Sequence, residues 1–194
     1  MNRLRTAILI SGRGSNMRAI LEAAKAPTYA ASPVLVLSNN PSAQGLETAA
    51  SMGVATDAVD HKPFGKDREA FERTLHGVLK RHRVEMVVLA GFMRILTPWF
   101  VGQWHQRMIN IHPSLLPKYT GLNTHKRALE AGDAEAGCSV HWVTEGVDEG
   151  AVIVQARVPI LEDDTEQSLE ARVLIEEHKL YPRAVDLAAR IILA

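Results

Sequence analysis

An amide and an imidazole lie two positions apart at Asn110 and His112, and a carboxylate follows at Asp148. On an extended segment, the side chains of Asn110 and His112 point to the same face. Together they can hold an oxygen atom, and a carboxylate folded back against the imidazole would help it to carry a proton. The three groups suit attack on a carbonyl carbon, because they stabilise a developing oxyanion without a covalent nucleophile.

These residues also have a structural interpretation. Asn110 and His112 alone are compatible with a buried histidine that an amide satisfies, and Asp148 alone with a residue that bends a hairpin. Glu145 and Glu149 lie in the same turn and compete with Asp148 for the role. The catalytic interpretation is favoured because Asn110 and His112 end a predicted strand, which is where ligands bind in parallel sheets.

The glycine-rich segment from Ser11 to Asn16 is a second candidate site, between the first predicted strand and the first predicted helix. Glycines let the backbone approach an anion, and the helix N-terminus offers unpaired N–H groups. Met17 stands where the dinucleotide fingerprint has its third glycine, and no Gly-Lys-Ser/Thr follows. Neither an NAD-binding fold nor a P-loop is therefore indicated. A mononucleotide phosphate fits, with a tight turn that binds nothing as the alternative.

Other reactive side chains favour structural roles. Ser114 lacks the pattern of a nucleophile elbow, and we interpret it as a turn-capping hydroxyl. Cys138 has no predicted activating base, and we interpret it as a small core residue. The eight histidines form no His-Glu-x-x-His motif and no His/Cys cluster, so we expect no metal.

Short apolar runs alternate with helical spacing along most of the chain. We expect strands at 7–11, 34–38, 55–59, 86–90 and 108–112, and helices at 16–25, 43–52, 67–82, 98–104 and 124–131. Segments 139–144 and 151–158 predict an antiparallel pair, followed by a helix at 165–181 and a separate helix that begins at Pro182. The pattern predicts an α/β fold with an open, doubly wound, mostly parallel sheet and a late antiparallel element.

Length and charge predict an ordinary globular protein. The 194 residues suit a single domain spanning 1–194, and a formal net charge of zero indicates neither nucleic acid nor an anionic membrane as a partner. One cysteine excludes an internal disulfide and fits a reducing compartment. No signal peptide and no apolar stretch of about 20 residues is recognisable, so we expect a cytoplasmic protein that binds small molecules.

Several motifs resemble the phosphoribosylglycinamide formyltransferases, a family of folate-dependent enzymes. The resemblance covers nearly the whole chain, in the blocks 8–12, 89–96, 110–119 and 181–182. It implies a Rossmann-like formyltransferase fold and a reaction of de novo purine biosynthesis. In that reaction the cosubstrate 10-formyltetrahydrofolate gives its formyl group directly to the amine of glycinamide ribonucleotide, through a tetrahedral intermediate.

The resemblance also implies roles for individual residues. The catalytic residues would be Asn110, His112 and Asp148, with His141 as a supporting residue close to them. A nucleotide half, about 1–100, and a folate-binding and catalytic half, about 101–194, would share the domain. The nucleotide would be bound by Gly14, Ser15, Asn16, Gly91, Met93, Pro113 and Glu177. The folate would be bound by Arg94, Ile95, Leu96, Val143, Thr144, Glu145, Gly146, Val147 and Asp148.

The chain departs from the family at four positions outside the catalytic residues. Arg13 stands where the family usually has a smaller residue, Thr120 replaces a proline and Asn123 a common histidine. Leu174 stands where some members place a polar residue towards the ribose. We expect a monomer or a homodimer.

Three alternative functions remain: a 10-formyltetrahydrofolate hydrolase, a formyltransferase with another acceptor, and a nucleotide-binding module without chemistry. The chain layout disfavours the first two, because the hydrolase normally adds an N-terminal domain and the enzyme acting on aminoacyl-tRNA adds a C-terminal domain with a basic surface. The three polar residues at a predicted strand end disfavour the third, since such groups are costly to keep buried without use.

Overall fold

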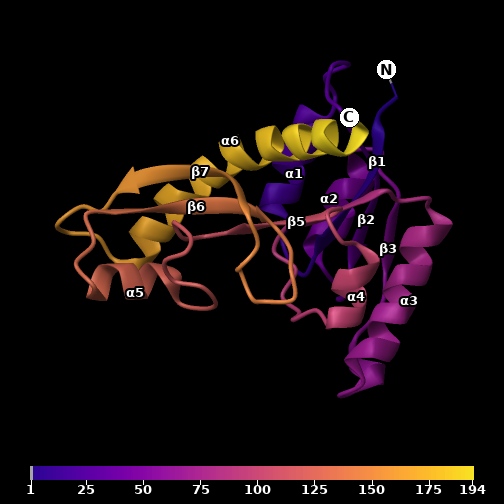
Figure 1. Ribbon diagram of the computed structural model, residues 1–194, viewed down its shortest axis with the longest axis horizontal. Coiled ribbons are helices and arrows are strands. Elements are labelled where there is room, and N and C mark those ends of the chain that lie inside the picture. The colour runs from indigo at the N-terminus through magenta and orange to yellow at the C-terminus, as the bar shows by residue number, and fades with distance from the viewer. Residues whose placement is uncertain (1) are drawn as a thin grey trace.

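Seven strands form one sheet in residues 2–194, the part of the chain that the computed structural model describes. Their order across the sheet is β3-β2-β1-β4-β5-β6-β7 (Figure 1). The first five strands pair in parallel, whereas β6 is antiparallel to both of its neighbours. The predicted fold class is confirmed. The strands are β1 (Leu4–Ile10), β2 (Ala31–Ser38), β3 (Thr56–Ala58), β4 (Met86–Leu89), β5 (Met108–His112), β6 (Glu135–Trp142) and β7 (Val152–Pro159).

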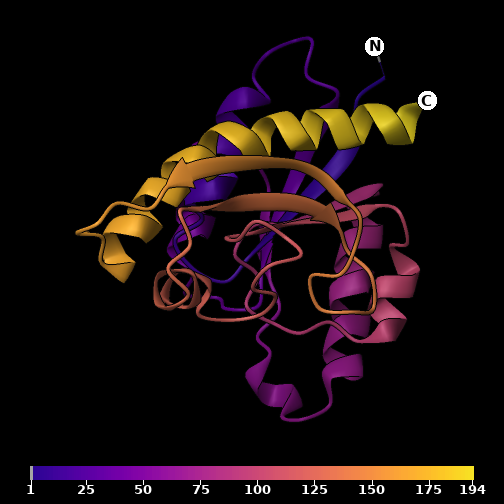
Figure 2. The ribbon, with the colours of Figure 1, turned by 60° about the vertical axis from the view of Figure 1, so that its left-hand side comes forward.

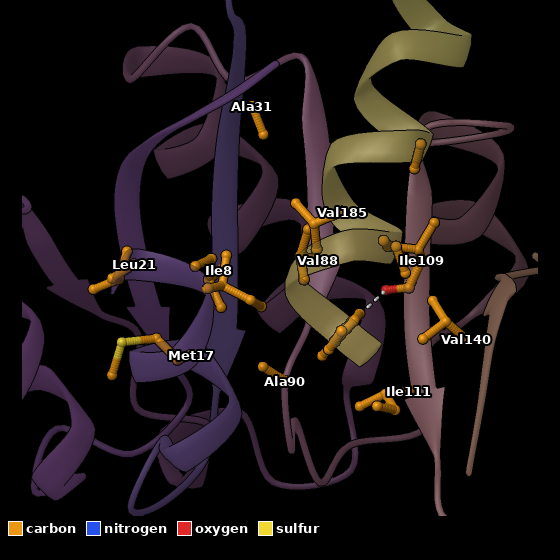
Figure 3. Close-up of a cluster of buried hydrophobic side chains, with 14 of the residues drawn as sticks. Ile8, Met17, Leu21, Ala31, Val88, Ala90, Ile109, Ile111, Val140 and Val185 are labelled. Carbon is orange, nitrogen blue, oxygen red and sulfur yellow. Dashed lines mark hydrogen bonds between the residues drawn. The ribbon is translucent and has the colours of Figure 1, made fainter. Parts of the chain in front are cut away.

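Helices cover both faces of the sheet, as strands made of continuous apolar residues require. In β1, Ile8 packs on the face covered by α1, α2 and α6, and Ala7 on the face covered by α3 and α4. Figure 3 shows Ile8 and Val88 of the sheet beside Val185 of α6. The helices are α1 (Ser15–Ala23), α2 (Gln44–Ser51), α3 (Arg68–Arg81), α4 (Pro98–Gln103), α5 (Thr124–Glu130) and α6 (Glu166–Leu193), with a 3-10 helix at Lys62–Phe64.

The predicted elements occur, with small differences at their ends. Asp67 caps α3, because its carboxylate accepts the N–H of Ala70 over 3.0 Å. The sixth strand begins at Glu135, well before the predicted start at Ser139, because it continues to pair with β7 as far as Pro159.

The prediction that Pro182 begins a separate helix is wrong. One helix, α6, runs from Glu166 to Leu193 with Pro182 inside it, and it crosses one side of the molecule (Figure 2). Its buried face continues past the proline through Tyr181 and Val185, which are both inaccessible to solvent. A proline in a helix interior costs about 3 kcal/mol or more, and the burial of this face outweighs that cost. No helix among residues 2–194 is long and apolar enough to cross a membrane.

A crevice forms between β1 and β4, where the order in which the strands are added to the sheet changes direction. The chain moves outward from β1 to β3 and then builds the other half from β4, which lies beside β1. The loops after two such strands leave space for a ligand at their carboxyl ends. Here the loops are residues 11–14 and 91–96, and they meet because the Ser11 N–H donates to the Gly91 carbonyl over 3.1 Å.

Candidate active site

The pairing of β5 with β6 brings two histidines and an amide to one place. In the antiparallel register, Asn110 lies opposite His141 and His112 opposite Ser139. Directly opposite residues of antiparallel strands present their side chains to the same face. Asn110 Nδ2 therefore lies 3.3 Å from His141 Nε2. His112 and His141 are both buried, at 6% and 2% exposure.

Asp148 joins these histidines from the loop between β6 and β7. Its Oδ2 lies 3.3 Å from His112 Nδ1, and its Oδ1 lies 3.5 Å from His141 Nε2. The Gly121 N–H donates to Asp148 Oδ2 over 2.9 Å. Asp148 adopts a φ of 56°, a left-handed conformation that aspartate tolerates better than most residues. The carboxylate is therefore held between two imidazoles and a backbone donor.

The outer ring nitrogens of both histidines face backbone carbonyls. His112 Nε2 lies 2.8 Å from the Tyr119 oxygen, and His141 Nδ1 lies 3.0 Å from the Trp142 oxygen. A carbonyl only accepts, so a hydrogen bond to it needs a proton on the facing ring nitrogen, and the tautomer of each histidine decides whether that proton is present. The two nitrogens of His112 thus face two different oxygen atoms, one of the Asp148 carboxylate and one of the Tyr119 carbonyl.

Opposing effects act on the pKa of Asp148. Burial raises it, because the charged carboxylate loses solvation. Hydrogen bonds from His141 and the Gly121 N–H, with the nearby charge of His112, act in the other direction and leave the pKa below its ordinary value of 3.8. Asp148 is therefore an ionised group at neutral pH.

A cavity of about 170 Å³, which we call the hairpin cavity, opens beside this cluster. Three members of the cluster line it: Asn110, His141 and Asp148. The residues predicted to bind folate line it as well, together with the apolar side chains of Leu89, Phe92 and Val101. Those predicted residues are Arg94, Ile95, Leu96, Val143, Thr144, Glu145, Gly146, Val147 and Asp148.

A second cavity of about 290 Å³, the glycine cavity, lies over the loops that follow β1 and β4. Five residues predicted to bind the nucleotide line it, namely Gly14, Ser15, Asn16, Gly91 and Met93. Arg13, which the sequence left without a role, lines it too and is its one ionisable side chain. Gly14 has a φ of 72°, a left-handed conformation that favours glycine, and a Cβ there would also lie 3.2 Å from the Gly45 Cα.

The remaining two predicted nucleotide residues lie elsewhere. Glu177 is buried and accepts a hydrogen bond from Asn16 Nδ2 over 2.7 Å. Burial raises its pKa above the ordinary value of 4.5, although the bond from Asn16 lowers it. Pro113 lines a different, small hollow with Tyr119, because the chain turns away from the glycine cavity after His112.

Other side chains take the structural roles expected of them. Ser114 donates its hydroxyl to the Lys118 carbonyl over 2.7 Å and caps a turn. Cys138 is buried, and burial raises the pKa of its thiol to about 12. Such a thiol is a poor nucleophile. Among residues 2–194, no group of three or more His, Cys, Asp and Glu side chains is arranged to hold a metal ion.

Sequence reasoning missed three parts of the cluster. His141 was expected near the catalytic residues, but not as the bridge between Asn110 and Asp148. The other two parts are the Tyr119 carbonyl and the Gly121 N–H. Backbone groups leave no signature in residue types, and only the register of β5 and β6 could have revealed that His141 faces Asn110.

Comparison with known proteins identifies the family. A family model described as formyl transferase matches residues 4–185. The chain belongs to the formyl transferase family. A phosphoribosylglycinamide formyltransferase from Escherichia coli (strain K12) is 48% identical over 178 residues, which cover 92% of this chain and 84% of that protein. The family resemblance inferred from sequence motifs is confirmed.

Further known proteins are similar to this chain in structure or in sequence. The crystal structure of phosphoribosylglycinamide formyltransferase from Brucella melitensis superposes with a TM-score of 0.92 at 46% identity, covering 97% of this chain and 96% of that one. The trifunctional purine biosynthetic protein adenosine-3 of Drosophila melanogaster is 51% identical over 185 residues. This chain spans only 14% of the length of that trifunctional protein.

Proposed function

We propose that this chain is a phosphoribosylglycinamide formyltransferase of de novo purine biosynthesis, acting in the cytoplasm as a monomer or homodimer. It transfers the formyl group of 10-formyltetrahydrofolate to the amine of glycinamide ribonucleotide and releases tetrahydrofolate. The observation that carries the proposal is the unbroken cluster of Asn110, His141, Asp148 and His112 at the end of β5, beside the hairpin cavity. Membership of the formyl transferase family supports the same reaction.

The proposed chemistry is direct transfer. The amine nitrogen attacks the formyl carbon, a new C–N bond forms, and the C–N bond to the folate nitrogen breaks. The formyl oxygen becomes negative in the tetrahedral intermediate, where the Asn110 amide and the His112 imidazolium hold it. The proton lost by the amine passes to the departing folate nitrogen, directly or through water, with His112 and Asp148 as its carriers.

His112 exchanges one hydrogen-bond partner to take this role. Its Nε2 faces the Tyr119 carbonyl, while Nδ1 faces Asp148. The formyl oxygen replaces the Tyr119 carbonyl as acceptor, and Asp148 keeps the ring in position. His141 acts as a positioning residue, because it contacts both Asp148 and Asn110.

The two cavities suit the two substrates. In the glycine cavity, the N-terminus of α1 with Gly14, Ser15 and Asn16 offers N–H groups to a phosphate, and Glu177 reaches the ribose beside Asn16. The hairpin cavity accepts the pterin against apolar side chains and the backbone of residues 143–148. We propose one domain over 1–194, in which residues 94–96 of the nucleotide half also contact the folate.

The test is the release of tetrahydrofolate from 10-formyltetrahydrofolate with and without glycinamide ribonucleotide. We expect release only with the nucleotide. His112→Ala and Asp148→Ala should each lower kcat by about 10²- to 10³-fold, since each removes a group that acts on the transition state. Release that ignores the nucleotide would instead indicate a hydrolase.

Two exposed residues provide matched controls for these variants. His105→Ala and Asp163→Ala remove the same side-chain types far from the cluster, and both should retain normal turnover. Near-normal turnover in purified, folded His112→Ala and Asp148→Ala would refute the assignment of the catalytic residues.

A further inference from the structure

Ser11 makes three hydrogen bonds where the first strand ends. Its N–H donates to the Gly91 carbonyl over 3.1 Å. Its hydroxyl donates to Asn39 Oδ1 over 2.5 Å and accepts the Met93 N–H over 2.8 Å. The side chain therefore joins the ends of β1 and β2 to the loop after β4.

The loop of residues 91–96 forms the wall shared by the two cavities. Gly91 and Met93 line the glycine cavity, and Arg94 to Leu96 line the hairpin cavity. Met93 and Ile95 of the loop are 72% and 67% exposed, whereas Phe92 is buried in the core and Leu96 packs against it. Within residues 2–194, both hydrogen bonds that tie residues 91–96 to the rest of the chain go to Ser11.

The hydrogen bond to Asn39, which follows β2, holds the Ser11 side chain in place. Asn39 is 5% exposed, and its backbone carbonyl lies 2.9 Å from His61 Nδ1. Because the only proton of the Ser11 hydroxyl is committed to this buried amide, the oxygen lone pairs point to Met93. The hydroxyl thus fixes the Met93 backbone of this loop relative to the sheet, beside the anchor that the buried Phe92 side chain provides.

We propose that Ser11 is a positioning residue that sets the wall between the two substrate cavities and so controls the binding of both substrates. This inference rests on the proposed function. Ser11 takes no part in the chemical step, because its donor and the acceptor facing the loop are used within the protein. Its loss should weaken both substrates while the catalytic cluster on β5 stays in place.

The test compares Ser11→Ala with Ser11→Thr, which keeps a hydroxyl. Ser11→Ala should raise KM for 10-formyltetrahydrofolate and for glycinamide ribonucleotide by about three- to tenfold each, because one anchoring bond is lost. Its kcat should stay within about twofold of the parent value. Ser11→Thr should restore both KM values. Ser51→Ala, which removes an exposed hydroxyl from α2, is the matched control and should change neither.

Amide hydrogen exchange provides a second measurement that needs no active enzyme. In the unmodified protein the Met93 amide should exchange at least about tenfold more slowly than its neighbours Arg94 and Ile95. Unchanged KM values in Ser11→Ala, a fall in kcat alone, or an unprotected Met93 amide would each overturn the proposal. Absence of nucleotide-dependent transfer in the unmodified protein would refute the proposed function instead, and the exchange result would still decide the role of Ser11.

Discussion

Asp148 and Glu177 are two carboxyl groups whose pKa values are shifted in opposite directions by their surroundings. Burial disfavours the charged form of both. Asp148 overcomes it with donors from His141 and Gly121, whereas among residues 2–194 the one donor to Glu177 is the amide of Asn16. Asp148 is therefore kept as an anion beside two imidazoles, whereas the pKa of Glu177 stays above its ordinary value.

The raised pKa of Glu177 predicts a stability effect. A carboxyl whose pKa is higher in the folded state stabilises the fold below its ordinary value of 4.5, and this contribution is lost as pH rises through the raised value. Glu177→Gln does not ionise and should escape that loss. The free energy of unfolding of the variant, relative to the parent, should therefore increase from about pH 4 to about pH 8.

Urea unfolding at several pH values measures this difference. The exposed Glu162→Gln variant is the control and should follow the parent at every pH. A difference between Glu177→Gln and the parent that does not change with pH would show that Glu177 does not titrate differently in the folded protein.

Individual helices and strands were predictable where a local pattern of residue types indicates them. The apolar run from Met86 gives β4, and Asp67 with the apolar spacing after it gives α3. The helix break expected at Pro182 failed because the rule is local, whereas the packing of Tyr181 and Val185 against the sheet is not. Tertiary burial overrides a local preference of this size.

The candidate site was predictable only in part, because the sequence does not define the register of β5 against β6. The residue types of Asn110, His112 and Asp148 indicated carbonyl chemistry, but no pattern states which residue of β6 faces Asn110. That register depends on the irregular segment between the two strands, which also supplies the Tyr119 carbonyl and the Gly121 N–H. The partners of the site residues are therefore set by backbone geometry, which residue types do not encode.

The loop between β6 and β7 returns to the sheet at Gly150, and this position permits no side chain. A Cβ on Gly150 would overlap the Trp142 carbonyl oxygen, which is the acceptor for His141 Nδ1. Gly150→Ala should displace that carbonyl and with it the His141 ring. We expect the free energy of unfolding to fall by about 1–3 kcal/mol, as in other overpacked sites. KM for the formyl donor should rise as well.

Thermal unfolding and steady-state kinetics measure the two effects. Gly102→Ala is the control, because a Cβ on Gly102 meets no atom within 4 Å. That variant should be at least as stable as the parent. A parent-like melting temperature and KM for Gly150→Ala would mean that the loop can shift without cost to His141.

At the scale of the molecule, α6 connects the last segment of the chain to the centre of the sheet. It packs on α1, β6 and β7, and Glu177 from its middle accepts a hydrogen bond from Asn16 in the first turn of α1. Tyr181, one turn later, is fully buried and donates its hydroxyl to the Leu89 carbonyl over 2.7 Å, with the Ile109 carbonyl at 3.4 Å. These carbonyls belong to β4 and β5, the two strands whose ends carry the loop and the cluster of the site.

Tyr181→Phe tests how much this buried hydrogen bond contributes to the stability of the fold. The change keeps the ring and removes the buried hydrogen bond from the Tyr181 hydroxyl to the Leu89 carbonyl, which should cost about 1–3 kcal/mol. For a chain of this size each kcal/mol lowers Tm by about 2–4 °C, so the melting temperature should fall measurably while the ring packing persists. Tyr119→Phe, whose hydroxyl binds the carboxylate of Asp133 near the surface, should change Tm much less. An equal fall in both variants would mean that the buried bond contributes no more than the peripheral one, and α6 would then be held by its apolar face alone.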